Sequence, residues 1–193
     1  MSFLQTQPII RTVRGTEVPA AGPWSIDPGH AEVAFIGRHF MLTKVRGRFT
    51  DVAGVVYIGD DPADSTVDVT ITMASVSSGS AERDDHLRSP DFFDVVNHSH
   101  ATFRSTAVTW KGRMAVVHGE LTIRGVGRGV VLEVEYLGAA TDPSGGERAI
   151  FSASTEINRE DWGLTWNMAL EAGGVLVSKK IRIEIEIETI RQR

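Results

Sequence analysis

The sequence predicts an all-β fold: an eight-stranded antiparallel barrel with short helical or loop segments around residues 80–97 and 159–173. The dominant hydrophobic period is two residues. It is clearest in IRIEIEIETI, residues 181–190, where isoleucines alternate with charged or polar side chains. Because successive side chains of a strand point to opposite faces, this segment has one dry face and one wet face. Eight long strands favour a closed barrel over a sandwich, because closure removes edges that promote aggregation.

The first half of the barrel is expected to contain the strands HAEVAFIGRHF, KVRGRFTDVAGVVYIG and STVDVTITMAS. In the first strand, alternation places Val33, Phe35 and His39 on one face. The second strand contains Gly54, which predicts a bend or bulge because glycine weakens a regular strand. The third strand has an apolar face made of Val67, Val69, Ile71 and Met73.

Two segments interrupt this alternation. Residues 80–97 are expected to form a short helix and a loop, and residues 159–173 are expected to do the same. Clusters of glycine, aspartate and proline between the other apolar runs predict tight turns. The remaining strands are HATFRSTAVTW, GRMAVVHGELTIRG, RGVVLEVEYLG, ERAIFSASTEINR and the final IRIEIEIETI.

Composition limits the function classes. The 193 residues include 20 Lys and Arg against 25 Asp and Glu, a formal net charge of −5, and the basic residues are scattered. A mildly acidic chain without a basic stripe has no electrostatic reason to bind nucleic acid. Cysteine is absent, which excludes disulfides, thiolate nucleophiles and cysteine metal ligands. The sequence also has no Gly-x-Ser-x-Gly elbow and no Walker-type loop, so it predicts no enzyme of those classes.

The first 23 residues are expected to be a mostly irregular N-terminal arm, with the barrel domain spanning residues 24–193. Polar residues and Pro8 interrupt any apolar signal-peptide core near the start. No stretch approaches the roughly 18 apolar residues of a membrane helix. We therefore expect a cytoplasmic protein.

Five motifs occur in the order found in one known family. They are WSIDPGHAEVAFIGRH, VRGRFTDVAG, ERDDHLRSPDFFD, GELTIRGVGRGV and INREDWGLTWN. Over about residues 24–190 the chain resembles the YceI-like family, polyisoprenoid-binding proteins with a lipocalin-like barrel. It departs from the family pattern at Ser99, where a proline is usual, and at Gly127 and Gly129, where threonine and proline usually flank the turn arginine.

The resemblance implies a ligand: a long apolar chain, such as a polyprenyl quinone or polyprenyl phosphate, held in the barrel interior. The protein would act as a carrier, store or sensor, without catalysis and with no cofactor required besides the bound lipid. The resemblance also implies a possible homodimer. Two alternatives stay open: a metal-dependent enzyme using histidine and aspartate ligands, and a structural or partner-binding barrel whose own side chains fill its core.

The predicted ligand-binding residues come from the inward strand faces and from the two irregular segments. Aromatic and methionine side chains in those segments could line the mouth of a cavity, or cap one barrel end as ordinary core. His39 and Arg159, with Arg38 and Arg83, are the expected partners of a polar headgroup. The full set is Val33, Phe35, His39, Phe49, Val69, Ile71, Met73, Phe92, Phe93, Phe151, Arg159, Trp162, Trp166, Met168, Ile183 and Ile185.

Histidines raise the question of a metal. Imidazole and carboxylate are common ligands of transition metals. His98 and His100, however, fall on the side of their strand opposite Ala101 and Phe103, so they should face outward or lie in the preceding loop. We therefore predict no metal site. The residues that could otherwise serve are Asp27, His30, His39, His86, His98 and His100.

Overall fold

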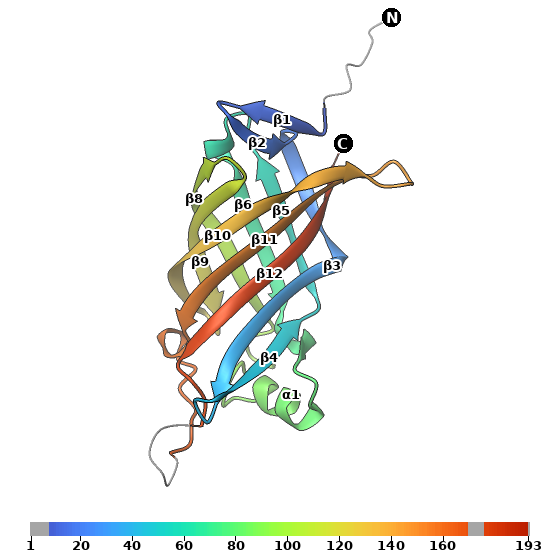
Figure 1. Ribbon diagram of the computed structural model, residues 1–193. Helices are drawn as coiled ribbons and strands as arrows, with labels where there is room; N and C mark the ends of the chain where they lie inside the picture. The colour runs from blue at the N-terminus through green and yellow to red at the C-terminus, as the bar shows by residue number, and fades with distance from the viewer. Residues whose placement is uncertain (1–7, 170–175, 193) are drawn as a thin grey trace, which may run out of the picture.

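The computed structural model describes residues 8–169 and 176–192, and these form a closed eight-stranded antiparallel barrel, as predicted (Figure 1). The sheet closes where the last strand pairs with the first long one. Around the ring the order is β3-β5-β6-β8-β9-β10-β11-β12, and β4 extends β5 along β3. The strands are β3 (Gly22–His39), β4 (Thr43–Phe49), β5 (Val52–Ile58), β6 (Thr66–Thr72), β7 (Val76–Ser77), β8 (His100–Lys111), β9 (Met114–Ile123), β10 (Val126–Thr141), β11 (Glu147–Asn158) and β12 (Lys180–Arg191).

The strand predicted from residue 44 to residue 59 is divided into β4 and β5. The break falls at Thr50 and Asp51, whose backbone N–H groups both donate to the Ser75 hydroxyl, at 3.2 and 3.1 Å. Gly54 has a different role from the predicted bend. A Cβ there would lie 2.2 Å from the carbonyl oxygen of Asp68, so the close approach of β6 requires glycine.

The N-terminal arm is a correction to the prediction. Its described part, residues 8–23, is not mostly irregular, because β1 (Ile10–Val13) and β2 (Thr16–Pro19) form a two-stranded hairpin. Its two-residue turn, Arg14–Gly15, has φ values of 49° and 79°, as in the type I′ turns that suit tight hairpins. Arg11 anchors the hairpin to the barrel by donating to the carbonyl oxygens of Gly59 and Asp60.

The two irregular segments contain short helices. Helix α1 (Ala81–Arg88) begins at Ser80, whose hydroxyl caps it by accepting from the Arg83 N–H at 3.4 Å. The second segment starts with the 3-10 helix η3 (Arg159–Trp162), which ends at Gly163 with φ 75°. Two further 3-10 turns flank β6, and they are η1 (Pro62–Asp64) and η2 (Met73–Ser75).

The two ends of the barrel differ. At the end beside β1 and β2, the fully buried Trp24, Ile58 and Tyr136 pack into one cluster, and the Trp24 indole donates to the Ala20 carbonyl at 2.9 Å. Helix α1 and the β3–β4 turn lie at the opposite end (Figure 1). None of the helices in the described ranges is long and apolar enough to cross a bilayer.

Candidate functional site

The interior of the barrel contains a cavity of about 390 Å³. Its walls are the inward faces of the strands, dominated by valine, isoleucine, leucine and phenylalanine side chains. A pocket of this size with an apolar lining and a few polar groups is typical of sites for small apolar ligands. The barrel is therefore not filled by its own side chains.

Most of the residues predicted to bind a ligand do lie on the cavity wall. Strand alternation accounts for those on β3, β4, β6, β11 and β12, because inward positions recur every second residue. The predicted residues that line the cavity are Val33, Phe35, His39, Phe49, Val69, Ile71, Met73, Phe92, Phe93, Phe151, Arg159, Trp166, Ile183 and Ile185.

Trp162 and Met168, which were also predicted to bind the ligand, do not line the cavity. Trp162 is 3% exposed and packs in the core, where its indole N–H donates to the Leu121 carbonyl at 2.9 Å. Met168 is 56% exposed on the outer surface. Both residues lie outside the regular strands, where no periodic pattern indicates the direction of a side chain.

Aromatic side chains that line the cavity form two groups of neighbouring rings. The rings of Phe35, Phe49 and Phe93 form an inner group with centroid separations of 5.5 to 6.3 Å. A second group, Phe92, Trp166 and His86, has separations of 4.5 to 5.3 Å. Phe92, Phe93 and Trp166 all line the cavity, and Phe92 and Phe93 are at the same time buried, so the two roles left open for them are not exclusive.

Basic side chains lie at the α1 end. Arg38 and Arg83 are exposed yet also line the cavity, so the cavity reaches the surface at these residues. Arg83 is held by Ser78, to whose hydroxyl and carbonyl oxygens it donates at 2.8 and 2.9 Å. His39 lines the cavity beside Arg38. The opening thus has an apolar interior behind a cationic rim.

Arg159 is the buried member of this group. It is 3% exposed, and its guanidinium donates to the carbonyl oxygens of Ser178, at 3.0 Å, and Leu164. Burial lowers the pKa of Arg159, because an apolar environment disfavours the charged form. No carboxylate forms an ion pair with it within residues 8–169 and 176–192. Arg159 therefore places a buried positive charge on the cavity wall, which the nearby Glu160 carboxylate offsets only in part.

The opposite end is closed. Trp24, Tyr136 and Phe151 pack beneath the hairpin of β1 and β2, and burial raises the pKa of Tyr136 to about 12. Two buried polar atoms of the described chain have no hydrogen-bond partner, Trp110 Nε1 and the Tyr136 hydroxyl oxygen. A ligand in the cavity could reach solvent at the α1 end, where exposed residues belong to its wall.

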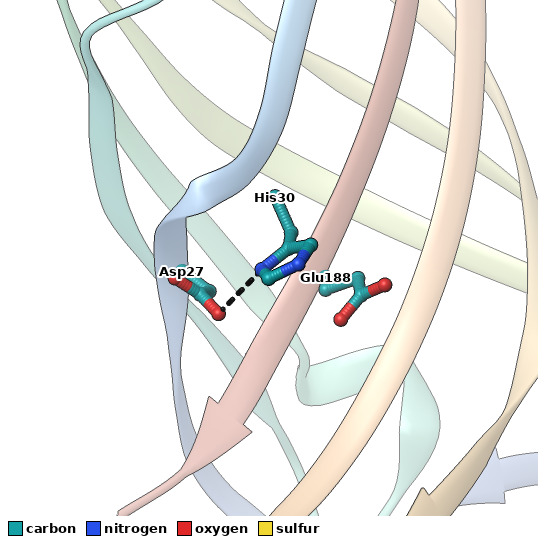
Figure 2. Close-up of side chains that lie close together, drawn as sticks. All are labelled: Asp27, His30 and Glu188. Carbon is teal, nitrogen blue, oxygen red and sulfur yellow. Dashed lines mark hydrogen bonds and ion pairs between the residues drawn. The ribbon is translucent and has the colours of Figure 1, made fainter.

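A separate group of side chains lies on the outside of the barrel. Asp27, His30 and Glu188 place possible ligand atoms within 4.8 Å of one another, and theirs is the one such group found in the described ranges (Figure 2). It forms because β3 makes an extra loop at residues 27–30: Ile26 pairs with Thr189 of β12, and the next pair is Ala31 with Ile187. The Asp27 carboxylate stabilises that loop by accepting from the Gly29 N–H at 3.0 Å.

Arg148 already pairs with both carboxylates of this group. Its Nη1 lies 2.6 Å from Asp27 Oδ2 and 3.2 Å from Glu188 Oε2, while His30 Nδ1 lies 3.0 Å from Asp27 Oδ2. The hydrogen bonds from Arg148 and His30 lower the pKa of Asp27 to about 2. A metal cation would have to displace a guanidinium, so the geometry favours a structural ion-pair network over a metal site.

The other candidate histidines are dispersed. His39 lies on the cavity wall and His86 at its aromatic rim, where its Nε2 is 3.0 Å from Asp91 Oδ2. His100 is exposed at the start of β8, and His98 lies in the loop before it, in agreement with the strand phase.

Comparison with known proteins identifies the family. The YceI-like domain matches residues 24–189, nearly the whole barrel. The chain belongs to the YceI-like family. A UPF0312 protein of Photorhabdus laumondii is 36% identical over 176 residues, which cover 90% of this chain and 88% of that protein.

Solved structures show the same YceI-like barrel. The Campylobacter jejuni YCEI protein is 30% identical, with a TM-score of 0.69 over 81% of this chain and 90% of that one. A polyisoprenoid binding domain from Saccharophagus degradans, described as implicated in plant cell wall breakdown, has a TM-score of 0.65 at 16% identity. It covers 88% of this chain and 98% of that domain, and at this identity the likeness concerns the fold.

Sequence reasoning missed several features of this YceI-like cavity. The inward residues of β9, including Val117 and Leu121, line it, and their period-two pattern was a sufficient signal. Arg148 and Glu188 were missed because nothing local links them to Asp27, which lies 121 residues before Arg148. Only the closure of the barrel brings those three together.

Proposed function

We propose that this protein binds one long-chain isoprenoid-type lipid, such as a polyprenyl quinone or a polyprenyl phosphate, inside its barrel. It acts as a carrier, store or sensor of that lipid and catalyses no reaction. The observation that supports this most directly is the apolar cavity of about 390 Å³, closed at one end and open between basic residues at the other. The name of the Saccharophagus degradans neighbour, a polyisoprenoid binding domain, agrees with it.

The cavity provides the driving force. Each CH₂ group transferred from water to an apolar environment contributes roughly 0.8 kcal/mol. A tail of several isoprene units thus gains many times that amount, against ordering and association costs of several kcal/mol. The wall offers valine, isoleucine and phenylalanine side chains to the tail along the length of the barrel.

The headgroup is proposed to lie at the α1 end. Arg38, His39, Arg83 and Arg159 are there, and guanidinium groups meet phosphate oxygens or a carbonyl oxygen with well-directed hydrogen bonds. An anionic headgroup would offset the charge of Arg159, which has only carbonyl partners in the described chain. This orientation places the tail beyond the rings of Phe35 and Phe93.

The two alternatives have less support. A filled-core barrel does not fit the volume that its side chains leave empty. A metal enzyme that acts on a ligand in the cavity would need its metal site near the cavity. The group of Asp27, His30 and Glu188 lies outside the barrel instead, and Arg148 forms an ion pair with its Asp27. We therefore expect binding without chemistry.

Mass spectrometry tests the proposal. The untagged protein is purified and extracted with organic solvent, and the extract is analysed alongside elemental analysis of the intact protein. We expect about one isoprenoid-type lipid per chain. Stoichiometric zinc, nickel or iron with no lipid would contradict the proposal, and absence of both would favour the structural alternative.

A pair of variants links the lipid to the cavity. Ala153 lies on β11 opposite Val134 and Ile185, which both line the cavity, so Ala153→Trp fills that space. Its neighbour Ser154 pairs with Glu133 and Glu184 on the outer face, which makes Ser154→Trp the matched control. We expect lipid to be lost from the first variant and retained by the second. Equal lipid content in the two variants would mean that the lipid binds outside the cavity.

A further inference from the structure

The turn between β3 and β4 carries three consecutive large apolar side chains. Phe40 and Met41 are each 50% exposed, and Leu42 is 78% exposed. We call Phe40–Leu42 the hairpin tip. Isolated apolar side chains on a surface are common, but three adjacent ones at a protruding turn form a surface that solvent disfavours.

The backbone makes this composition more unusual. Phe40 and Met41 have φ values of 53° and 59°, a left-handed conformation that favours glycine or asparagine at both central positions of a tight hairpin turn. Bulky residues are uncommon in this region of conformational space. The hairpin tip therefore has large apolar side chains where the turn geometry favours small or polar residues. This indicates that these side chains serve an interaction and not the stability of the fold.

Positive charge flanks the hairpin tip. Arg38 and Lys44 are exposed on either side of it and pair with each other across the two strands. The Arg38 guanidinium donates to the Leu42 carbonyl at 3.2 Å, and neither cation has a carboxylate within ion-pair distance in the described parts of the chain. In a protein with a net charge of −5, this turn is locally cationic.

The hairpin tip borders the open end of the cavity. Arg38, His39 and Val45, on the strands that lead into and out of the turn, all line the cavity. The Phe40 N–H donates to the Leu176 carbonyl at 2.9 Å, and the Leu176 N–H donates to the Met168 carbonyl at 3.0 Å. Exposed Met168 thus extends the apolar surface. The turn lies at the end of the barrel away from the β1–β2 hairpin (Figure 1).

We infer that the hairpin tip inserts into the surface of an anionic lipid bilayer and brings the open end of the cavity against it. Apolar side chains that enter the headgroup region, next to cations that attract anionic lipids, are the standard means of peripheral membrane binding. The inference goes beyond lipid binding in the cavity, because docking is defined by residues outside the cavity and does not require a bound ligand.

A second copy of the chain fits this surface less well. Symmetric dimers bring the same patch of both subunits together. A dimer through the hairpin tip would place Arg38 and Lys44 of one subunit close to the same cations of the other. An anionic bilayer has the opposite charge, so it matches both the apolar and the cationic parts of the surface.

Vesicle flotation tests the inference. The full-length protein is mixed with vesicles of phosphatidylcholine alone, or of phosphatidylcholine with about one third phosphatidylglycerol, and the bound fraction is measured after flotation. We expect binding to the anionic vesicles that weakens as salt is added, because screening reduces attraction between the cations and the surface. The phosphatidylcholine vesicles should bind at least several-fold less protein.

A triple variant removes the apolar side chains of the hairpin tip and is designed to preserve the turn. Phe40→Asn and Met41→Gly introduce the residues that such a turn prefers, and Leu42→Thr removes the third apolar side chain. Partition onto anionic vesicles should fall about tenfold or more. The control is Met114→Asn at the other end of the barrel, where Met114 is 49% exposed and follows Arg113, which pairs with Glu17 of β2 at 2.6 Å. Its partition should not change.

Two results would overturn the inference: no binding of the wild-type protein to anionic vesicles, or equal partition of wild type and triple variant. In the first case, a dimer that the triple variant dissociates would assign the hairpin tip to contact between two copies of the chain. The lipid content of the same preparations, measured by mass spectrometry, reports on the cavity separately. A protein that holds lipid but does not float would disprove docking and leave the proposed function intact.

Discussion

The ring of Phe35 occupies the space where a side chain at position 47 would lie. The two residues pair across β3 and β4, and a Cβ built on Gly47 would be 2.2 Å from Phe35 Cζ. Phe103 covers Gly119 in the same way, at 2.4 Å. Both rings also line the cavity. Glycine in the wall therefore lets an aromatic ring lie flat against the barrel, which keeps the interior open.

Replacing Gly47 with alanine should reduce lipid binding. The added methyl group displaces the Phe35 ring, and the nearest free space is the cavity, so Gly47→Ala should fold but hold less lipid. Lipid per chain by mass spectrometry and the thermal midpoint check both parts of this expectation. Gly129→Ala is the control, because a Cβ there has no atom within 4 Å and should change neither quantity. Full lipid content in Gly47→Ala would show that Phe35 moves elsewhere.

Arg159→Met should destabilise the protein by about 2–4 kcal/mol, since the buried carbonyl groups of Leu164 and Ser178 each lose a charged donor worth about 1–3 kcal/mol. Urea unfolding measures the change. Arg128→Met is the control, because Arg128 is exposed and donates only to the neighbouring Gly127 carbonyl. Similar unfolding midpoints for the two variants would mean that the Arg159 contacts contribute little.

Asp27 should contribute stability that disappears in acid. Its pKa is lowered from an ordinary 3.8 to about 2, so the folded protein favours the charged carboxylate more than the unfolded chain does. That contribution is complete above about pH 5 and is lost as the pH falls through the folded-state pKa of about 2. Urea unfolding from pH 2 to 6 should show a shallower acid slope for Asp27→Asn than for wild type.

The test must compare the acid slopes of Asp27→Asn and wild type, because other carboxyl groups with a lowered pKa also make the protein less stable in acid. Hydrogen bonds from Ser144, Gly146 and Arg148 also lower the pKa of Asp142, so part of the acid slope will remain in the variant. Asp27→Asn should in addition be less stable than wild type at neutral pH, because Arg148 loses one of its carboxylate partners. Identical acid slopes would exclude Asp27 as a source of acid sensitivity.

Val18→Ala should destabilise the barrel although it lies outside the YceI-like match. Val18 on β2 is 0% exposed and lies two residues before Ala20, which belongs to the cluster at the closed end of the barrel. Loss of two buried methyl groups, with the small void that results, is expected to cost about 1–3 kcal/mol. Thr12→Ala on the exposed side of β1 is the control and should leave the thermal midpoint unchanged. No effect of Val18→Ala would mean that the hairpin folds independently of the barrel.

Period-two alternation was sufficient to predict the barrel and much of its inner surface. Ile183 and Ile185 face the cavity because a strand presents every second side chain to the same side, a property of the local backbone alone. The prediction loses accuracy where the phase changes. In β8 the register shifts between Ser105 and Ala107. Before the shift the odd-numbered Phe103 faces the cavity, and after it the even-numbered Val108 and Trp110 do.

Only the tertiary structure decided the remaining features, because they depend on contacts between distant segments. Asp27 meets Arg148 and Glu188 only when β12 closes against β3, and the resulting ion pairs make a metal site there unfavourable. Met168, outside any regular strand, had no pattern to indicate that it points outward beside the hairpin tip. The sequence by itself determined the eight long segments of the barrel and which of their faces are dry, whereas the β1–β2 hairpin and the division between β4 and β5 appeared only in the structure. The packing of those strands decided that the dry faces enclose an open cavity and where that cavity meets the surface.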